Sequence, residues 1–472
     1  MQMVSRVLRV LPIAALMFLI LLSTSEARMV NPWSIDRLAK QASLIAVGEV
    51  MDVGPAGTAS RSEWTTWIQD MNAHVKILRI CPSSQASGLA VGDVITLRYE
   101  RYDMAKTGGL LNGYDFPQLS PGDCCAFPLV KLTQDGKDLW KLIDREDFGL
   151  IVPCLKQPPR GPSPTTTKPF LISELANVFA LGNPKDIYRG AGYHNNTLWS
   201  DAANVGLLHD SIASVVKDNE ARWLDIAVIT YNSMGTPRPS IAVLKTGKMP
   251  EHPWANTVLV AKALSHIPKK DMDKKFITAT IKHMDVLPWG PGVTLSQNYA
   301  SNPLAISLLI KCLGAGDPVA IVVSESVIRA NRHKGLLHAA VEASMRLITA
   351  SGVAPHTGLG TALRLVMEYG SESQFKTVLD VFQESLKEDH DEFFQMWQSL
   401  AYSKSKREIA VIRIAITDDT LWPHWQGMRV SDVAAGELQR ITGVEFGTGS
   451  RDSDAERSAA LEKAKEWLAE NP

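Results

Sequence analysis

Cysteine is the residue type in this chain whose placement best suits chemistry. Five cysteines occur, at positions 81, 124, 125, 154 and 312. In an exported protein, a local group of four favours one or two disulfides, so Cys81, Cys124, Cys125 and Cys154 are the disulfide candidates. Cys124 and Cys125 are neighbours, and neighbouring side chains of a strand point to opposite faces. One of them can therefore pair while the other lies in the core. Four cysteines allow three pairings, and the sequence leaves that choice open.

A metal site is the rival interpretation of these cysteines. The chain has no CxxC pair, and no histidine stands near the four cysteines at ligand spacing. We therefore predict no metal and no cofactor. Cys312 lies in the apolar segment LAISLLIKCL, which indicates a core residue rather than a ligand.

Two other groups of residues could act on or bind a partner. His194, Asp201 and His209 could converge in a hydrolase or lyase site near residues 189–210, although no HExxH, GxSxG, GxGxxG or P-loop motif accompanies them. Trp422, His424 and Trp425 form the segment LWPHW between two expected helices. Exposed aromatic side chains there could be a docking hot spot. The alternative is a loop folded onto the neighbouring helices.

The N-terminal residues predict export. Arg6 and Arg9 precede the apolar run Leu11–Leu22, and small residues at Ser25 and Ala27 follow it. This is the pattern of a secretory signal peptide, here residues 1–27. The run is shorter than the roughly 20 apolar residues that span a bilayer. We expect a periplasmic, secreted or cell-surface protein; retention of the segment as a membrane anchor is the alternative.

The spacing of apolar residues changes once along the chain, across the Pro-rich stretch 155–169. Before it, short apolar runs are typical of strands, and after it apolar residues recur at helical spacing. A net charge of −1 gives no field that would attract nucleic acid. The fold class is therefore α+β: a small β-barrel domain at 28–154, a linker at 155–169 and an α-helical domain at 170–472.

The barrel region begins with a short helix capped by Ser34 and continues with LIAVGEVMDV, a strand in which Gly48 could mark a bulge. VITLRYE, CCAFPLVKL, LWKLI and FGLIVP follow as further strands, with Pro128 expected at an edge or a bulge. This order resembles the OB-like barrel of the netrin and tissue-inhibitor-of-metalloproteinase superfamily. Inhibitors of that superfamily bind the protease zinc through an N-terminal cysteine. A mature chain starting near Arg28 has none before Cys81, so a protease-inhibitor-like barrel is only an alternative.

Helix signals are frequent after residue 170. Asp317-Pro318, Ser371, Ser431 and Ser453-x-x-Glu456 can each begin a helix, and Gly443 can end one. Helix pairs would repeat every 35–45 residues or so, as in HEAT or armadillo-type units. Residues 360–472 resemble the closing repeat of exported bacterial HEAT-like proteins. The stretches 189–199 and 235–254 are expected to be irregular.

These features favour an exported, non-enzymatic binding or scaffold protein. Its α-solenoid would offer a long surface to a protein partner, and its barrel a second docking face. The sequence does not identify that partner or the oligomeric state.

Overall fold

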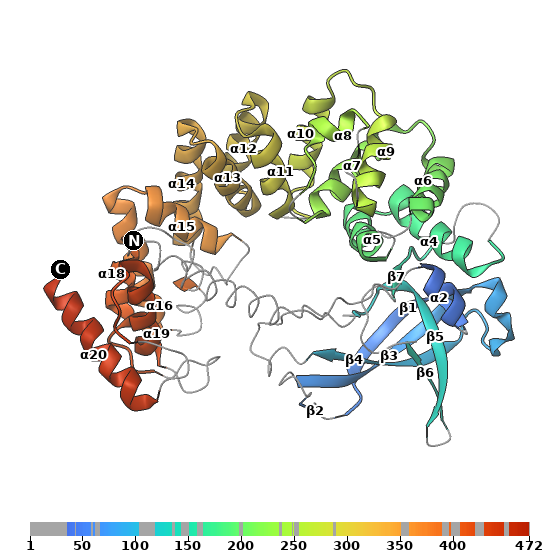
Figure 1. Ribbon diagram of the computed structural model, residues 1–472, viewed down its shortest axis with the longest axis horizontal. Helices are drawn as coiled ribbons and strands as arrows, with labels where there is room; N and C mark the ends of the chain where they lie inside the picture. Colours follow the sequence, from blue (N-terminus) through green and yellow to red (C-terminus); the bar gives the residue numbers. More distant parts are fainter. Residues whose placement is uncertain are drawn as a thin grey trace, which may run out of the picture. The chain divides into compact units, whose positions relative to one another are not determined.

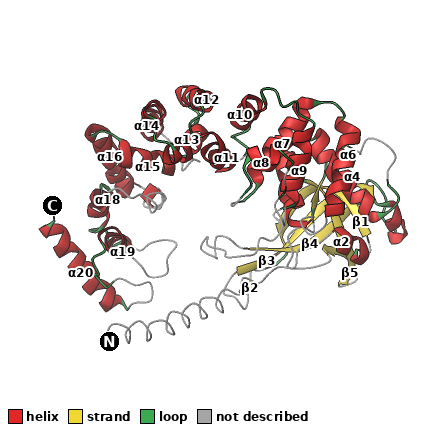
Figure 2. Ribbon diagram, turned by 45° about the horizontal axis from the view of Figure 1, so that its top comes forward, coloured by secondary structure: helices red, strands yellow, loops and turns green. Residues whose placement is uncertain are grey.

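The structure is a computed structural model. It describes residues 35–42, 44–57, 60–61, 67–102, 119–134, 137–142, 151–157, 164–197, 202–235, 238–247, 249, 254–286, 289–350, 358–388, 396–397, 406–420, 429–447 and 453–471. The predicted signal segment 1–27 lies outside these residues. The chain divides into two compact units, one made of 1–181 and 193–215 and the other of 182–192 and 216–472. Strands gather in the first unit and helices make up the second (Figure 2). The domain boundaries expected from sequence stay a prediction.

The first unit contains a closed five-stranded β-barrel. Its strands are β1 (Leu44–Pro55), β3 (Trp67–Ile80), β4 (Val94–Tyr102), β5 (Cys124–Gln134) and β6 (Lys137–Leu142). They are hydrogen-bonded in the order β1-β3-β4-β6-β5, and pairing between β1 and β5 closes the ring. β4 and β6 are parallel, whereas the other neighbours are antiparallel. The α+β architecture with an OB-like barrel is thus confirmed (Figure 1).

Shorter elements complete the barrel. They are α2 (Ile35–Gln41), β2 (Ser60–Arg61), the 3-10 helix η1 (Pro82–Ser87) and β7 (Val152–Pro153). The short helix expected after Ser34 is confirmed, and its Ile35 and Leu38 are fully buried. Burial of two large apolar side chains stabilises this short helix, which would be marginal in isolation.

Gly48 lies where β1 departs from regular pairing with β3. The register shifts between Val47 and Gly48, as expected for a bulge at this glycine. A Cβ atom at Gly48 would lie 2.3 Å from Cγ1 of Val75, a buried side chain of β3. The two strands therefore approach each other in a way that only glycine permits.

Pro128 corrects one expectation. It lies within β5, paired with Ile45 of β1, rather than on an edge strand. On the other side of β5, Ala126 pairs with Val152 of β7 and Leu129 pairs with Leu142 of β6. On that side of β5, Pro128 lies between the residues paired with β7 and those paired with β6. No partner strand needs an N–H donor at this position, so proline is tolerated there.

Helix α4 (Thr167–Leu181) belongs to the same unit as the barrel and packs on β7 and α2. Most of α6 (Ala202–Val216) is in this unit as well. α4 is buried on nearly all sides, since ten of the eleven positions from Phe170 to Ala180 are buried and only Ser173 is not. Such a helix needs neighbours around its whole circumference.

The second unit consists of helices within the described residues. Their bounds are α7 (Glu220–Ser233), α8 (Ile241–Lys245), α9 (Ala255–Ser265), α10 (Met272–Lys282), α11 (Trp289–Tyr299), α12 (Pro303–Gly314), α13 (Pro318–Ala330), α14 (Lys334–Thr349), α15 (Leu359–Tyr369), α16 (Glu372–Glu388), α18 (Glu408–Ala415), α19 (Val430–Thr442) and α20 (Asp454–Glu470). α5 (Pro184–Thr197) is divided between the two units. No described helix is long and apolar enough to cross a membrane.

These helices stack as antiparallel pairs in two rows. One row runs α10, α12, α14, α16, and each helix contacts the next. The other row runs α7, α11, α13, α15 in the same way, and α10·α11, α12·α13 and α14·α15 join the rows. The first-row helices begin at residues 272, 303, 334 and 372, so their spacings are 31, 31 and 38 residues, and two of these are shorter than the expected 35–45. The expected succession of stacked pairs is therefore confirmed, and no strand interrupts it in the described residues from 167 onward (Figure 1).

Local signals set many helix ends where the sequence predicts them. The Asp317 side chain accepts from Val319 N–H, and the Ser371 hydroxyl from Gln374 N–H. Ser453 and Glu456 form a capping box, and Gly443 ends α19 with a φ of 73°. These caps satisfy backbone groups that a helix end leaves unbonded.

Three expectations about where helices lie are wrong. Residues 189–197 are helical, within α5, because Asn183 and Asp186 cap that helix reciprocally around Pro184. Residues 241–245 form α8, capped by Ser240. α19 begins at Val430 rather than after Ser431, because Asp432 accepts from the Arg429 N–H.

Candidate functional site

Arg79 connects three parts of the barrel unit. Its guanidinium donates to the carbonyl oxygens of Leu155, at 2.7 Å, and Lys156, at 2.9 Å, in the segment after β7. Its Nε and Nη2 donate to the two carboxylate oxygens of Glu174 on α4, at 2.9 and 2.8 Å. A bidentate charged pair of this kind is both strong and specific in orientation. Arg79 therefore holds α4 and the preceding segment against the barrel.

Glu174 is the most buried carboxylate of this cluster, with 1% of its surface exposed. Burial raises its pKa, while the hydrogen bonds and charge of Arg79 act in the opposite direction. A carboxylate placed here without Arg79 would be an uncompensated charge in an apolar helix.

Two thiols lie beside this pair. Burial raises the pKa of Cys124 to about 11 and that of Cys154 well above its ordinary value, and Arg79 offsets only part of either shift. Both are therefore protonated at neutral pH, whereas a cysteine nucleophile needs the thiolate. The arrangement suits a structural role better than nucleophilic catalysis.

A second contact fixes the start of α4. The hydroxyls of Ser83 and Thr167 are 3.0 Å apart, and Cys81 Sγ lies 3.9 Å from Thr167 Oγ1. α4 is thus attached to the barrel near both its first turn and its middle.

The structure places all four predicted disulfide cysteines in the barrel unit, buried. None of Cys81, Cys124, Cys125 and Cys154 is disulfide-bonded in this structure. Cys312 is not a core residue as expected, since it is only half-buried. The buried face of α12 consists of Ala305, Ile306, Leu309 and Leu313, and Cys312 lies next to this face rather than on it.

The other predicted site residues are less completely described. Trp422, His424, Trp425 and Asp201 lie outside the described residues. His194 lies in α5, at a position whose side chain is not described. His209 lies on α6, with Nδ1 3.0 Å from Oδ1 of its exposed neighbour Asp210. Convergence of His194, Asp201 and His209 stays a prediction.

A pocket lies near His209 but does not include it. Its volume is about 210 Å³, and it is bounded by Pro164, Pro169, Ile172, Asn177, Leu207 and Ser211 among others. No acid, base or cysteine lines it. It is also smaller than the roughly 300–1,000 Å³ of ordinary small-molecule sites. In the described part of the chain, no group of three or more His, Cys, Asp or Glu side chains could hold a metal ion.

Buried carboxylates link successive helices of the second unit. Glu325 on α13 accepts from Arg364 on α15 at 2.9 and 3.0 Å, and from Arg329 at 3.0 Å. Burial by itself raises the pKa of Glu325, but the two arginines lower it overall. Glu408 on α18 accepts from Arg440 on α19 at 3.2 Å. These ion pairs fix the position of α15 against α13 and of α19 against α18.

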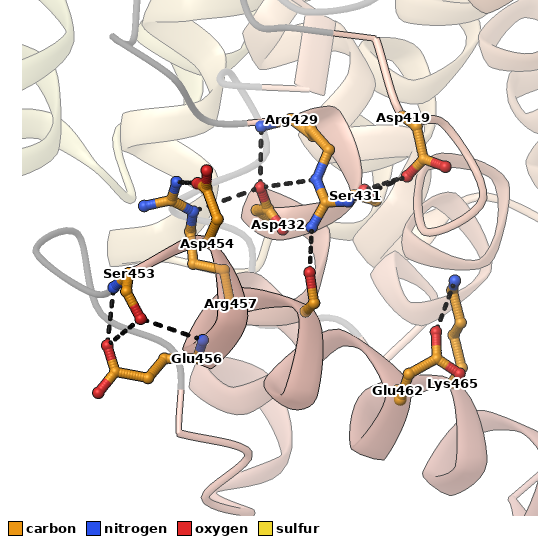
Figure 3. Close-up of polar contacts among 11 residues, drawn as sticks. Asp419, Arg429, Ser431, Asp432, Ser453, Asp454, Glu456, Arg457, Glu462 and Lys465 are labelled. Atoms are coloured by element: carbon orange, nitrogen blue, oxygen red, sulfur yellow. Dashed lines mark hydrogen bonds and ion pairs between the residues drawn. The ribbon is translucent and has the colours of Figure 1, made fainter.

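The last two helices share the most extensive of these networks (Figure 3). Arg429 and Arg457 both point to the buried Asp432, at 2.8 and 3.7 Å. Burial by itself raises the pKa of Asp432, yet the hydrogen bonds of Arg429 and the charges of both arginines lower it. Asp419 accepts from the Ser431 hydroxyl at 3.0 Å beside them. Each of these four charged side chains has an oppositely charged neighbour, so the group positions α20 against α19.

Glu408 gives this unit a predicted pH dependence. Burial raises the pKa of Glu408 to about 7, which Arg440 offsets only in part. Between pH values of about 4.5 and 7 the folded chain therefore holds a proton that the unfolded chain has released. Stability should fall as pH rises through this window, by on the order of 2–3 kcal/mol. In Glu408→Gln this contribution should be absent.

The measurement is denaturant unfolding of both proteins across that window, followed by helical circular dichroism. The difference between the two proteins isolates Glu408 from other titrating groups. Glu462→Gln, at an exposed pair with Lys465 on α20, is the matched control and should track the wild type. A constant difference between wild type and Glu408→Gln across the window would contradict the assignment.

The sequence analysis did not identify Arg79, Glu174, Glu325 or Glu408. Their common signal is an acid inside an apolar segment, as in PFLISELANVF around Glu174 and IVVSESVI around Glu325. Charged residues in such segments are almost never buried unless they are paired. Helical periodicity was inferred from the apolar residues, so it gave no signal for these buried carboxylates.

Comparisons with known proteins identify no relative. No protein-family model, no curated protein and no solved structure matches this chain.

Proposed function

We propose that this protein is an exported, non-enzymatic binding or scaffold protein. The helical unit acts as a HEAT-like solenoid that binds a protein partner, and the barrel, of netrin and tissue-inhibitor-of-metalloproteinase type, is a second docking face. The observation that carries this proposal is the two-row stack of helix pairs. Each pair buries its apolar side against the pairs before and after it, so a long flank remains available along the row.

Exposed aromatic side chains give this surface a candidate anchor. Trp289, at the start of α11, is 65% exposed, and Trp254, just before α9, is 46% exposed. Both positions adjoin the C-terminal end of α7. Gly290 packs against the Asn232 backbone, and Asn256 Nδ2 lies 3.4 Å from Ser233 Oγ. Large exposed aromatic residues dominate the energetics of many protein interfaces.

The buried carboxylate pairs support a scaffold in the same way. They hold neighbouring helices at fixed positions, and a preformed surface loses less conformational entropy on binding. A protein segment is the partner class that fits a long surface with separate apolar anchors, since the described pocket is small and lacks titratable groups.

In the test, the mature chain is immobilised and used to capture proteins from the exported fraction of its source. The amount of each retained protein is measured. We expect one or a few proteins to be retained, and Trp254→Ala/Trp289→Ala to reduce their retention by at least about tenfold. Val444→Ala, at an exposed apolar side chain just after α19 and far along the chain from both tryptophans, is the control and should retain them equally. Retention that is indifferent to the tryptophan variants would refute the anchor. Absence of any retained protein would refute the partner itself.

A further inference from the structure

The geometry points to one disulfide site in this chain: we propose that Cys124 and Cys154 form a cross-strand disulfide, while Cys81, Cys125 and Cys312 remain thiols. The inference concerns the barrel unit and does not depend on the proposed function. It selects one partner set from the pairings that the sequence leaves open.

Cys124 and Cys154 lie directly opposite each other. β5 and β7 pair Cys125 with Pro153 and Ala126 with Val152, so the next position in this register joins Cys124 to Cys154. The Cys154 N–H donates to the Cys124 carbonyl at 3.0 Å, which confirms that the register continues. Opposite residues of a hydrogen-bonded antiparallel pair have Cα atoms about 5.5 Å apart. This separation lies within the range that disulfides span.

The two side chains also share the outer face of the barrel. Cys124 pairs with Glu49 of β1, whose carboxylate accepts from Lys156 Nζ at 2.5 Å outside the barrel. The Cys154 thiol donates to the Val152 carbonyl oxygen at 3.3 Å, and the charge of Glu174 on α4, a helix that packs on β7, acts on this thiol. Arg79 and Glu174 both influence each thiol electrostatically. Two sulfur atoms on one face, in facing positions, meet the directional requirement of a disulfide.

Cys81 lies too far away to compete. Its N–H donates to Ile45, whereas Cys124 faces Glu49, four residues further along β1. Four strand residues span about 13 Å. Helix α4 gives a second estimate of the distance between Cys81 and Cys154. Cys81 contacts Thr167 at the start of α4, whereas Cys154 lies near Glu174 in its middle. Two helical turns separate these positions, or about 10 Å. Neither distance can be bridged without moving the backbone.

Cys125 is excluded by its direction. It pairs with Gly48, where a Cβ atom would point at the buried Val75 side chain. Opposite residues of an antiparallel pair share a face, so Cys125 points into the barrel interior. It therefore lies on the other face of β5 from Cys124, although its charge still reaches Cys154.

The reaction requires an oxidant that carries a disulfide, such as an oxidised dithiol protein or glutathione disulfide. One thiolate of the pair attacks it to form a mixed disulfide, and the second displaces the oxidant's remaining thiol. Two protein thiols thus lose two electrons and two protons, and one disulfide is reduced to two thiols. Since burial raises the pKa of both thiols, exchange is slow once α4 is docked. We therefore place the step during folding, before α4 covers the pair.

The cross-link would strengthen the region that Arg79 organises. It ties β5 to the residue just before Leu155 and Lys156, whose carbonyls Arg79 binds. The barrel is thereby closed covalently at the point where the chain leaves it for α4. We expect the oxidised form to melt about 5–10 °C above the reduced form in the barrel unit.

The experiment refolds the reduced full chain in a glutathione redox buffer, blocks remaining thiols by alkylation and maps the peptides by mass spectrometry. We expect one disulfide peptide that joins Cys124 to Cys154, a mass lower by two hydrogens, and alkylation at the other three cysteines. Cys124→Ser and Cys154→Ser should lose the cross-link, and Cys125→Ser should keep it.

Two results would overturn the proposal. The first is a cross-link that includes Cys81, Cys125 or Cys312 in the refolded chain. The second is a refolded chain, with its helical circular dichroism restored, in which all five thiols remain open to alkylation after unfolding. Since the wild-type map alone can give either result, the test holds even if a serine variant fails to fold.

Discussion

Arg79→Met should weaken the attachment of α4 to the barrel by about 3–5 kcal/mol, one of the two largest effects that we expect in this protein. The substitution removes both hydrogen bonds to Glu174 and leaves that carboxylate buried beside α4 without its counter-charge. It also removes the donors for the carbonyls of Leu155 and Lys156. Desolvation of the remaining charge, rather than loss of the pair's own attraction, is the main cost.

Hydrogen exchange of the peptide that covers α4 measures this effect without requiring the whole chain to unfold in two states. Exchange there should accelerate by about 10²–10³-fold in Arg79→Met. The double variant Arg79→Met/Glu174→Met should recover most of the protection, because it removes the stranded charge. Lys156→Met removes a more exposed partner of Glu49 and is the control, with little change expected. Protection in Arg79→Met close to that of the wild type would show that the pair does not hold α4.

Glu325→Leu should destabilise the helical unit by a similar amount, about 3–5 kcal/mol. The carboxylate neutralises Arg364, which is almost fully buried, and it also accepts from Arg329. Its removal leaves the Arg364 guanidinium between α13 and α15 with no carboxylate from α13. Arg329 retains its pair with Glu368, so the effect is centred on Arg364.

Denaturant unfolding followed by helical circular dichroism gives the measurement, since helices supply this signal. The double variant Glu325→Met/Arg364→Met should return the midpoint to near the wild-type value, because well-packed apolar residues can replace a buried ion pair without loss. Glu384→Gln changes the same charge at an exposed pair with Lys387 and should shift stability by at most about 1 kcal/mol. Equal midpoints for Glu325→Leu and Glu384→Gln would contradict this prediction.

The spacing of apolar residues in the sequence was enough to predict that strands precede a long series of helices. The run LIAVGEV is a short apolar run that contains Gly48, and the structure has β1 there with a register shift at that glycine. Cap residues such as Asp317 and Ser453 mark helix starts because their side chains bond the first N–H groups locally. The apolar stripe of the last helix predicts burial of Ala460, Leu461, Ala464, Trp467 and Leu468, and all but Trp467, which is half-buried, are buried.

Other features depended on contacts between residues distant in the sequence. Residues 189–197 contain two glycines and two asparagines, which favour a loop locally, yet they are helical in the folded chain. Pro128 looked like an edge residue, but β5 changes its partner from β7 to β6 at that position. Intrinsic propensities are weak compared with such tertiary contacts.

The sequence by itself determined that a small barrel precedes a long series of paired helices, because strand and helix periods are local properties of the chain. Only the tertiary structure decided which charges are buried and which thiols face each other. Glu174 meets Arg79 across 95 positions of sequence, and Cys124 meets Cys154 through the register of two strands. Such partners are set by how elements pack, and no local pattern encodes a distance between them.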